Sequence, residues 1–216
     1  VEEGEYIAIM GESGSGKTTL LNILASLDKP TSGEDLLDGK DLTKISDKHI
    51  SAFRRDNLGF VFQDFNLLDT FNVADNIYLP LVLSKEPYAL MKPKLEKLAK
   101  PLGIEHLLEK YPYEISGGQK QRLSIARTLS KGSEVILFDE ATSALDNNSQ
   151  DYIKKTIDNL VNDHTIVIVA HRLSTIMDAD IIHVVDGGKV IATGNHKELL
   201  NSCKIYRNLY ETESLN

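Results

Sequence analysis

The segment from Tyr6 to Ala25 decides the fold, and it reads YIAIMGESGSGKTTLLNILA. Its first five residues are an apolar run typical of a buried strand, and the residues from Thr19 onward have helical spacing. Between the two, GESGSGKT from Gly11 to Thr18 matches the phosphate-loop pattern G-x-x-x-x-G-K-[ST], in the strand-loop-helix context that this loop requires. The segment therefore predicts a site for a phosphate group.

The chemistry of this loop depends on its backbone and on two side chains. Its glycines let the chain wrap a phosphate with backbone N–H groups at the positive end of a helix. Lys17 is placed to reach the β and γ phosphates of a nucleotide, and the Thr18 hydroxyl is placed to ligate Mg²⁺. The candidate phosphate-binding residues are Gly11, Ser13, Gly14, Ser15, Gly16, Lys17, Thr18 and Thr19.

Two adjacent carboxylates, Asp139 and Glu140, end a second apolar run that starts at Val135. This arrangement delivers Asp139 to Mg²⁺ and leaves Glu140 beside the γ phosphate, where it can orient or deprotonate water. Phosphate loops also occur in GTPases and small kinases, but the sequence lacks an N-K-x-D motif for recognition of guanine. These residues therefore favour ATP over GTP as the nucleotide.

The rest of the chain alternates short β-rich runs with helical segments, which is the pattern of an α/β fold with a largely parallel sheet. We expect core strands at 6–10, 58–62, 135–138 and 165–170. A hairpin is expected around Gly187 and Gly188, with strands at 181–186 and 189–193. Further helices are expected after Gly117, at about 149–161 and, as two short ones, near the C-terminus.

The segment from Asn72 to Ile115 differs from its surroundings, because strand signals stop and leucines at helical spacing take over, interrupted by five prolines. We therefore predict an α/β P-loop NTPase domain with a largely parallel core sheet, antiparallel β elements and an inserted α-helical subdomain. The core is expected to cover about residues 1–71 and 134–216. The helical subdomain is expected to cover about residues 72–133.

The composition of the 216-residue chain argues against several classes of protein. Lys and Arg total 24 and Asp and Glu total 32, so the net charge of −8 argues against a nucleic-acid binder that relies on a basic surface. No apolar run approaches the ~20 residues of a membrane span, so no direct membrane insertion is expected. Cys203 is the single cysteine and cannot form an intrachain disulfide, which fits a reducing compartment.

The residues ISGGQKQR, from Ile115 to Arg122, resemble the LSGGQ signature of ABC ATPases. Ser116 and two glycines open a helix whose free N–H groups and dipole can hold a phosphate. One nucleotide does not need two such helix ends, so the second is expected to face an ATP bound to another subunit. The resemblance thus implies an ATP-dependent head-to-tail homodimer whose nucleotide contacts include Ser116, Gly117, Gly118 and Gln119.

The resemblance to ABC ATPases extends over essentially the whole chain. Gln63 is similar to the Q-loop glutamine, Ser143 to Asp146 resembles the D-loop, and His171 resembles the switch histidine that contacts the γ phosphate. The family implies ATP and Mg²⁺ as ligands and hydrolysis that powers transport through a separate membrane subunit. The implied catalytic residues are Glu140, His171 and Gln63, and the implied metal ligands are Thr18, Gln63 and Asp139.

The implied partner is a transmembrane permease subunit, which places the chain at the cytoplasmic face of a membrane. In the family the Q-loop and the helical subdomain form a groove for a short helix of that subunit. Phe65, Leu67 and Phe71 are expected to include groove residues. A Glu-Lys-Tyr-Pro-Tyr-Glu segment precedes the signature, so the coupling resembles that of stand-alone ATPase subunits.

Two departures from the family pattern affect these expectations. An aromatic residue upstream of the first strand stacks on adenine in the family, but only ten residues precede Gly11, and Tyr6 lies within the strand. At about 1 to 3 kcal/mol for base stacking, ATP affinity is expected to fall by roughly one to two decades. Residues to about Arg127 resemble stand-alone ATPase subunits, whereas those from about Glu134 resemble domains fused to membrane spans. This difference predicts a recombinant or engineered mosaic, or else an unusual natural subfamily.

Two alternatives to a transport ATPase stay open at this point. The first is a non-transport ABC ATPase that acts on ribosomes or in DNA repair, against which the acidic charge and the lack of a basic arm argue. The second is a folded but inactive chimeric domain, although every catalytic residue type is present in the sequence.

Overall fold

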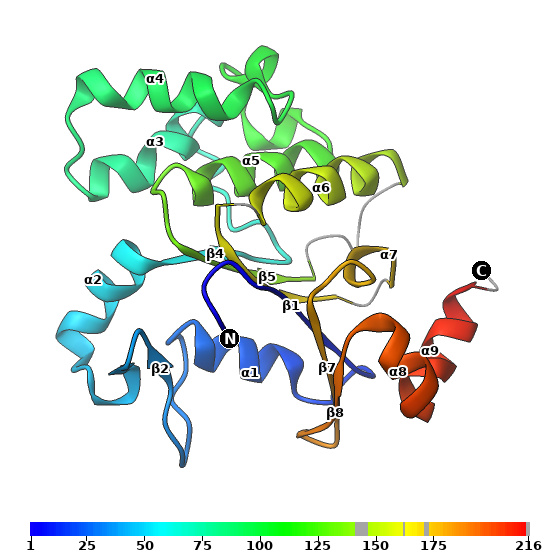
Figure 1. The fold of residues 1–216 in the computed structure, drawn as a ribbon. Coiled ribbons are helices and arrows are strands. Elements are labelled where there is room, and N and C mark those ends of the chain that lie inside the picture. The colour runs from blue at the N-terminus through cyan, green and yellow to red at the C-terminus, as the bar shows by residue number, and fades with distance from the viewer. Residues whose placement is uncertain (141–146, 162, 171–172, 215–216) are drawn as a thin grey trace.

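The computed structural model describes residues 1–140, 147–161, 163–170 and 173–214, and its centre is a six-stranded sheet of order β4-β5-β6-β1-β7-β8 (Figure 1). The five strands from β4 to β7 are parallel to their neighbours, and only β8 pairs antiparallel, with β7. The strands are β1 (Tyr6–Met10), β4 (Leu58–Val61), β5 (Val135–Asp139), β6 (Thr165–Val169), β7 (Ile181–Asp186) and β8 (Lys189–Gly194). The predicted fold class and all six predicted strands are confirmed.

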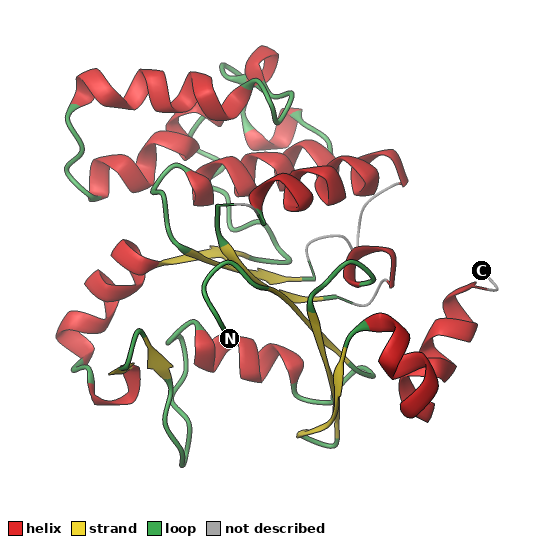
Figure 2. Cartoon of the chain, viewed as in Figure 1, coloured by secondary structure: helices red, strands yellow, loops and turns green. Residues whose placement is uncertain are grey.

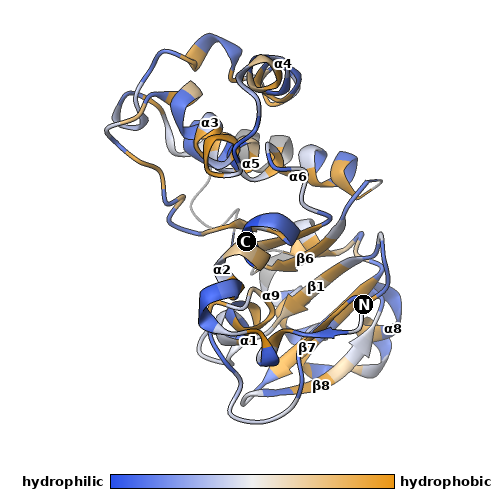
Figure 3. Ribbon diagram, turned by 90° about the vertical axis from the view of Figure 1, so that its left-hand side faces the viewer, coloured by the Kyte–Doolittle hydropathy of each residue, from blue (hydrophilic) through white to orange (hydrophobic). Residues whose placement is uncertain are grey.

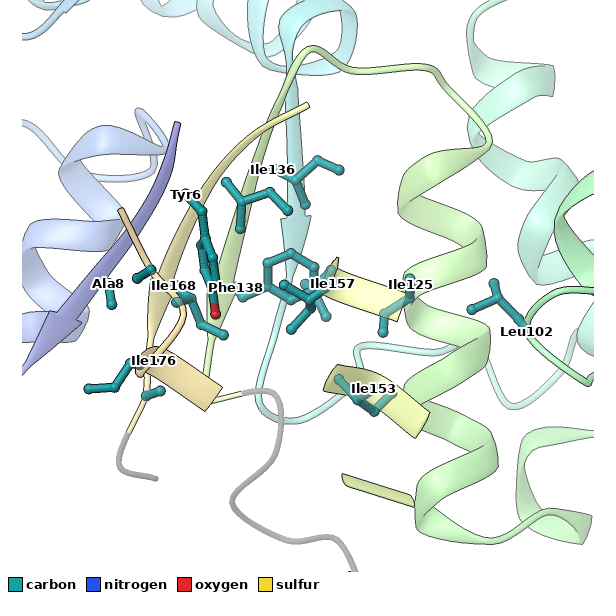
Figure 4. Packing of buried hydrophobic residues seen from close by; sticks show 14 of the residues in the cluster. Tyr6, Ala8, Leu102, Ile125, Ile136, Phe138, Ile153, Ile157, Ile168 and Ile176 are labelled. Atoms are coloured by element: carbon teal, nitrogen blue, oxygen red, sulfur yellow. The ribbon is translucent and has the colours of Figure 1, made fainter. Parts of the chain in front are cut away.

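Each central strand is apolar on both sides because both faces of the sheet are covered. In β1, Tyr6 and Ala8 face one buried cluster, whereas Ile7 and Ile9 face a second cluster on the opposite face. Figure 4 shows Tyr6 and other sheet residues of the first cluster beside residues of the covering helices. The Tyr6 hydroxyl donates to the Thr175 carbonyl, so this side chain belongs to the core, as the sequence predicts.

Helices cover the two faces unequally (Figures 1 and 2). On one face, α1 (Lys17–Leu24) packs Leu21 against the smaller cluster, and α2 (Asp47–Asn57) contacts β4. The larger cluster is covered by α5 (Gly117–Leu129), α6 (Asn147–Leu160), α7 (Leu173–Ile176), α8 (His196–Ser202) and α9 (Lys204–Ser214). The helices α3 (Val73–Leu83) and α4 (Tyr88–Ala99) pack on α5 and lie farther from the sheet (Figure 3).

The prolines of the segment 72–115 interrupt its helices less than the sequence predicts. Pro80 lies inside α3 and Pro93 inside α4, although each proline removes one backbone donor from its helix. Pro87 instead stands at the start of α4, where its missing N–H group costs nothing. Both interrupted helices are held by apolar packing, through buried residues such as Ile77 and Leu95.

Three small elements are not among the sequence predictions. Helix α2 is mostly charged or polar, apart from Ile50, Ala52 and Phe53, and it has no fully buried residue, so its apolar stripe is too short to identify a helix in the sequence. The hairpin of β2 (Leu36–Leu37) and β3 (Lys40–Asp41) has two residues per strand, and α7 has four residues. Among the described residues, no helix combines the length and apolarity that crossing a membrane would need.

Candidate nucleotide-binding site

The loop from Gly11 to Gly16 joins the end of β1 to the start of α1. Gly14 and Gly16 have φ angles of 79° and 101°, which side chains other than glycine rarely adopt. At Gly11 an added Cβ atom would lie 2.1 Å from the Val185 carbonyl oxygen. The backbone shape of the loop therefore depends on these glycines.

The start of α1 is prepared to accept an anion. No side chain caps the helix, and its first turn contains no acidic residue. The N–H groups of this turn therefore have no capping acceptor, and the turn supplies no negative charge beside them. The Ser15 side chain is 6% exposed, and its hydroxyl has no hydrogen-bond partner in the described part of the chain. These features fit a phosphate group held by the loop.

Lys17 is buried at the centre of the site, and its Nζ atom donates to the Glu12 carbonyl at 2.8 Å. Burial lowers the pKa of Lys17, whereas the negative charges of Glu140 and then Asp139 raise it. The lysine therefore lies within electrostatic reach of both candidate carboxylates. A cation in this position can neutralise phosphate charge.

The end of β5 brings the two carboxylates to the same edge of the sheet as the loop. The Thr18 hydroxyl donates to Asp139 Oδ1 at 3.4 Å, so the two residues predicted to hold Mg²⁺ are adjacent. Glu140 is half-buried with φ 46°, and its N–H donates to the Val169 carbonyl at 2.9 Å. A left-handed conformation in a residue other than glycine stores backbone strain, which is common at functional sites.

Gln63 follows β4, whose carboxyl end lies at the same edge of the parallel sheet. Its side chain is exposed. The structure therefore places the ends of β1, β4 and β5, which carry the phosphate loop, Gln63 and Asp139, at one edge of the sheet, with β6 between β5 and β1. The crevice at the carboxyl ends of parallel strands is where ligands bind in open α/β sheets.

The signature residues lie elsewhere, at the start of α5 in the helical layer above the sheet, whereas α1 lies below it (Figure 1). Ser116 caps α5, and its Oγ accepts from the Gln119 N–H at 3.3 Å. In return, the Ser116 N–H donates to Gln119 Oε1 at 2.8 Å. Ser116 and Gly117 are exposed, so this helix end is open to another molecule.

The groove in the structure is lined by other residues than those predicted. A groove of about 360 Å³ lies beside the end of β4, but Phe65, Leu67 and Phe71 are half-buried and do not line it. Its apolar lining includes Phe60 and Phe62, whose ring centroids are 4.1 Å apart. Its cationic lining consists of Arg54, Arg55, Arg127 and Lys131.

Two predicted features fall outside the described residues, namely His171 and the segment 143–146. Conversely, the sequence does not predict the polar residues of α5 that bind the chain near Gln63, among them Ser124, Arg127 and Thr128. The sequence carries no clear signal for them, because α5 also contains other polar residues, such as Lys120 and Arg122, and their partners are backbone carbonyl groups. Burial lowers the pKa of Arg127, but a guanidinium remains charged in proteins.

A sequence profile of the ABC transporter family matches residues 1–143, which include the phosphate loop, the signature segment and both carboxylates. The chain is 47% identical over 173 residues to the ABC transporter ATP-binding protein YxdL of Bacillus subtilis, which covers 79% of this chain and 67% of that protein. It is 39% identical over 190 residues to the lipoprotein-releasing system ATP-binding protein LolD of Blochmanniella floridana, which covers 87% and 81%.

Among solved structures, the chain is similar to a dimeric post-hydrolysis state of the ATP-binding cassette MJ0796 bound to ADP and Pi. The TM-score is 0.84 at 34% sequence identity, and the match covers 90% of this chain and 87% of that chain. The likeness therefore covers both the sheet and the helical layer.

Proposed function

The chain belongs to the ABC transporter family of ATP-binding proteins, and on this premise we propose that the edge of the sheet formed by the ends of β1, β4 and β5 is its ATP site. The chain is an ATPase whose hydrolysis is coupled to transport. The observation that carries the assignment of the site is the meeting of Thr18 and Asp139 at 3.4 Å, with Lys17 in the field of Asp139 and Glu140.

In this proposal the residues from Gly11 to Thr19 hold the phosphates through their N–H groups and Lys17. Thr18, Asp139 and Gln63 hold Mg²⁺, which, when bound, neutralises charge on the phosphates. Glu140 orients and deprotonates the attacking water, and His171 and Gln63 assist it. Catalysis then rests mainly on positioning and on charge neutralisation.

We further propose that the signature residues from Ser116 to Gln119 act on the ATP of a second copy of the chain. Support comes from the exposure of Ser116 and Gly117 at a helix end that lies across the sheet from α1. The similar cassette MJ0796 is described as dimeric. Each complete site then combines the phosphate loop of one chain with the signature of the other.

For the membrane partner, we propose that the groove between Phe60, Phe62 and the four cations receives a helix of the transmembrane subunit. The groove concentrates Arg54, Arg55, Arg127 and Lys131 in a chain whose net charge is −8. Charge complementarity favours a helix with an apolar face and carboxylates. Capture of the membrane subunit from detergent extracts should be lost in Arg54→Glu and kept in Lys48→Glu, a matched change on the same exposed helix. Equal capture by both variants would exclude this surface.

The Mg-ATP hydrolysis rate, measured against protein concentration, tests the proposed function. We expect the rate to rise faster than linearly, because two chains form each site. Glu140→Gln should bind ATP but lower turnover by about 100- to 10,000-fold, the usual contribution of a general base. A rate that stays linear would argue against the shared site, and a variant that keeps most of the activity would show that Glu140 is not the catalytic carboxylate.

A further inference from the structure

The loop that follows Gln63 is held by α5 rather than by the sheet. Arg127 donates from Nη2 to the Phe65 carbonyl at 2.8 Å and from Nη1 to the Asn66 carbonyl at 2.5 Å. The Ser124 hydroxyl, one turn earlier on the same face of α5, also reaches the Phe65 carbonyl, at 3.4 Å. Two consecutive carbonyl groups, two and three residues beyond Gln63, are therefore held by one guanidinium.

The backbone held in this way is strained. Phe65 and Asn66 have φ angles of 61° and 48°, two consecutive left-handed residues of which neither is glycine. Asparagine tolerates this region, but a bulky residue such as phenylalanine rarely enters it. Such a conformation persists only where its surroundings hold it. The contacts from Arg127 and Ser124 supply part of that support.

Before Gln63, the same helix is attached to the strand. The Thr128 hydroxyl donates to the Phe60 carbonyl at 3.0 Å, and Lys131, two residues beyond the last residue of α5, donates from Nζ to the Leu58 carbonyl at 2.9 Å. The side chains of α5 thus contact the chain both in β4 and in the loop, and Gln63 lies between these two sets of contacts. A displacement of α5 at Arg127 would reach the loop directly.

The other end of α5 is the signature. Gly117 begins the helix and Arg127 stands ten residues later, which at 1.5 Å per residue is about 15 Å along one rigid element. If α5 rotates as one body, Arg127 therefore moves together with Ser116. Helix α3 also holds this loop, because Asn76 donates to the Leu68 and Phe71 carbonyls, but of the two helices only α5 begins at the signature.

We propose that Arg127 is a positioning residue for Gln63. The orientation of α5 depends on whether a nucleotide occupies its signature end. Through Arg127, this orientation determines where Gln63 lies at the Mg²⁺ edge of the site. The inference rests on the proposed function and deepens it. When the partner's nucleotide occupies the start of α5, Arg127 moves the Phe65–Asn66 turn with the helix, and Gln63 moves with the turn. Hydrolysis in one site then depends on contact with the other chain.

The test compares Arg127→Met with Arg207→Met. Methionine keeps an unbranched apolar stem, lacks the guanidinium and leaves no unpaired buried charge. Arg207 is a matched control, because it also donates hydrogen bonds to two consecutive carbonyl groups. Its Nε donates to the Leu200 carbonyl at 2.7 Å and its Nη2 to the Asn201 carbonyl at 2.9 Å, far along the chain from Gln63. We expect Arg127→Met to lower kcat by about 10- to 100-fold, the effect of a misplaced group in an active site. The Mg²⁺ concentration for half-maximal rate should rise, with KM for ATP nearly unchanged.

A spectroscopic readout separates coupling from a structural role. The chain contains no tryptophan, so Phe65→Trp introduces a single reporter in the loop. In a Glu140→Gln background, saturating Mg-ATP should shift the emission of this tryptophan. The shift should be lost on adding Arg127→Met, be partly kept with Arg127→Lys, and be unaffected by Arg207→Met.

The outcomes distinguish this inference from the proposed function. If the unmodified chain neither binds nor hydrolyses ATP, the proposed function fails, and the inference fails with it. If it hydrolyses ATP and Arg127→Met behaves like Arg207→Met in kcat, in Mg²⁺ dependence and in the tryptophan signal, only the inference is overturned. If Arg127→Met does not fold, Arg127→Lys provides the test, because one ammonium group cannot reproduce the hydrogen bonds to both carbonyl groups. A wild-type kcat and Mg²⁺ dependence in Arg127→Lys would overturn the inference.

Discussion

Helices α1 and α5 each begin at a candidate phosphate site, but their first turns are prepared in opposite ways. The start of α1 follows Gly16, has no side-chain cap and contains no acidic residue in its first turn. The start of α5 is closed by Ser116 and Gln119, which accept each other's N–H groups. The first helix end is ready for an anion, whereas at the second the cap occupies the N–H groups of Ser116 and Gln119 and leaves those of Gly117 and Gly118 outside it.

Because of this difference, binding of ATP by one chain is separate from the assembly of two chains. A reciprocal cap contributes about 1 kcal/mol, and a hydrogen bond to a charged group contributes about 1.5–3 kcal/mol. A phosphate presented by a second chain can therefore displace the cap with a net gain, but the gain per contact is small. The proposed site on α1 is formed within one chain, and the site on α5 becomes occupied only when both chains and ATP are present.

The largest expected effect is at α1, from Lys17→Met. Removing this cation should lower kcat/KM for ATP by about 100- to 1,000-fold, since it neutralises phosphate charge in the ready site. Because burial lowers the pKa of Lys17, methionine should not destabilise the chain without nucleotide. Steady-state kinetics and thermal unfolding measure the two quantities, and Lys97→Met, a change of an exposed lysine on α4, is the control. An unchanged kcat/KM would remove Lys17 from the site.

Ser116→Ala tests whether α5 acts on the nucleotide of the other chain. We expect a 10- to 100-fold lower kcat, with the Kd of a dilute single chain for ATP unchanged, because the lost hydrogen bond forms only in the dimer. Asn195→Ala is a matched control, since Asn195 and Glu198 form the same reciprocal cap at the start of α8. Both variants should lose about 1 kcal/mol of stability, and only Ser116→Ala should lose activity. A weaker Kd for the single chain would place Ser116 in the same site as Lys17 and end the contrast.

A smaller effect distinguishes a glycine of the phosphate loop from a glycine at the start of α5. Gly11→Ala should lower the free energy of unfolding by about 1–3 kcal/mol, because its Cβ atom would lie 2.1 Å from the Val185 carbonyl oxygen. Gly117→Ala meets open space and should be neutral or stabilise by up to about 1 kcal/mol, since alanine favours a helix. Urea unfolding of both variants gives the two numbers. Equal losses would show that the start of α5 is as tightly packed as the phosphate loop.

The sequence predicts the sheet well because its strands are apolar on both faces, as in Ile7 to Met10, and this pattern is local. It does not predict α2, because that helix buries no residue fully. It also misjudges Pro80 and Pro93, whose cost is offset by packing that involves distant parts of the chain. The bounds of the helical subdomain and the mosaic origin of the chain stay predictions.

At the site, the residues that bear chemistry are predictable, because glycines, Lys17 and paired carboxylates stand in fixed patterns. Arg127 is not, since its partners are backbone carbonyls of a loop about sixty residues earlier, and a carbonyl group leaves no mark in a sequence. Asn76 is a similar case: it is fully buried and donates to the Leu68 and Phe71 carbonyls. Tertiary hydrogen bonds to the backbone are visible only in the fold.

The turn at Gly187 and Gly188 has a consequence for attaching labels or tags to this protein. Exposed hairpin tips ordinarily tolerate inserted sequence. Here the Gly188 N–H donates to the Ser15 carbonyl at 3.0 Å, and a Cβ atom on Gly16 would stand 3.7 Å from the Gly188 Cα atom, so the tip rests against the phosphate loop. A peptide inserted there would disturb nucleotide binding, whereas the exposed turn at Asp38 and Gly39, between β2 and β3, offers a place for a fluorophore or an affinity tag.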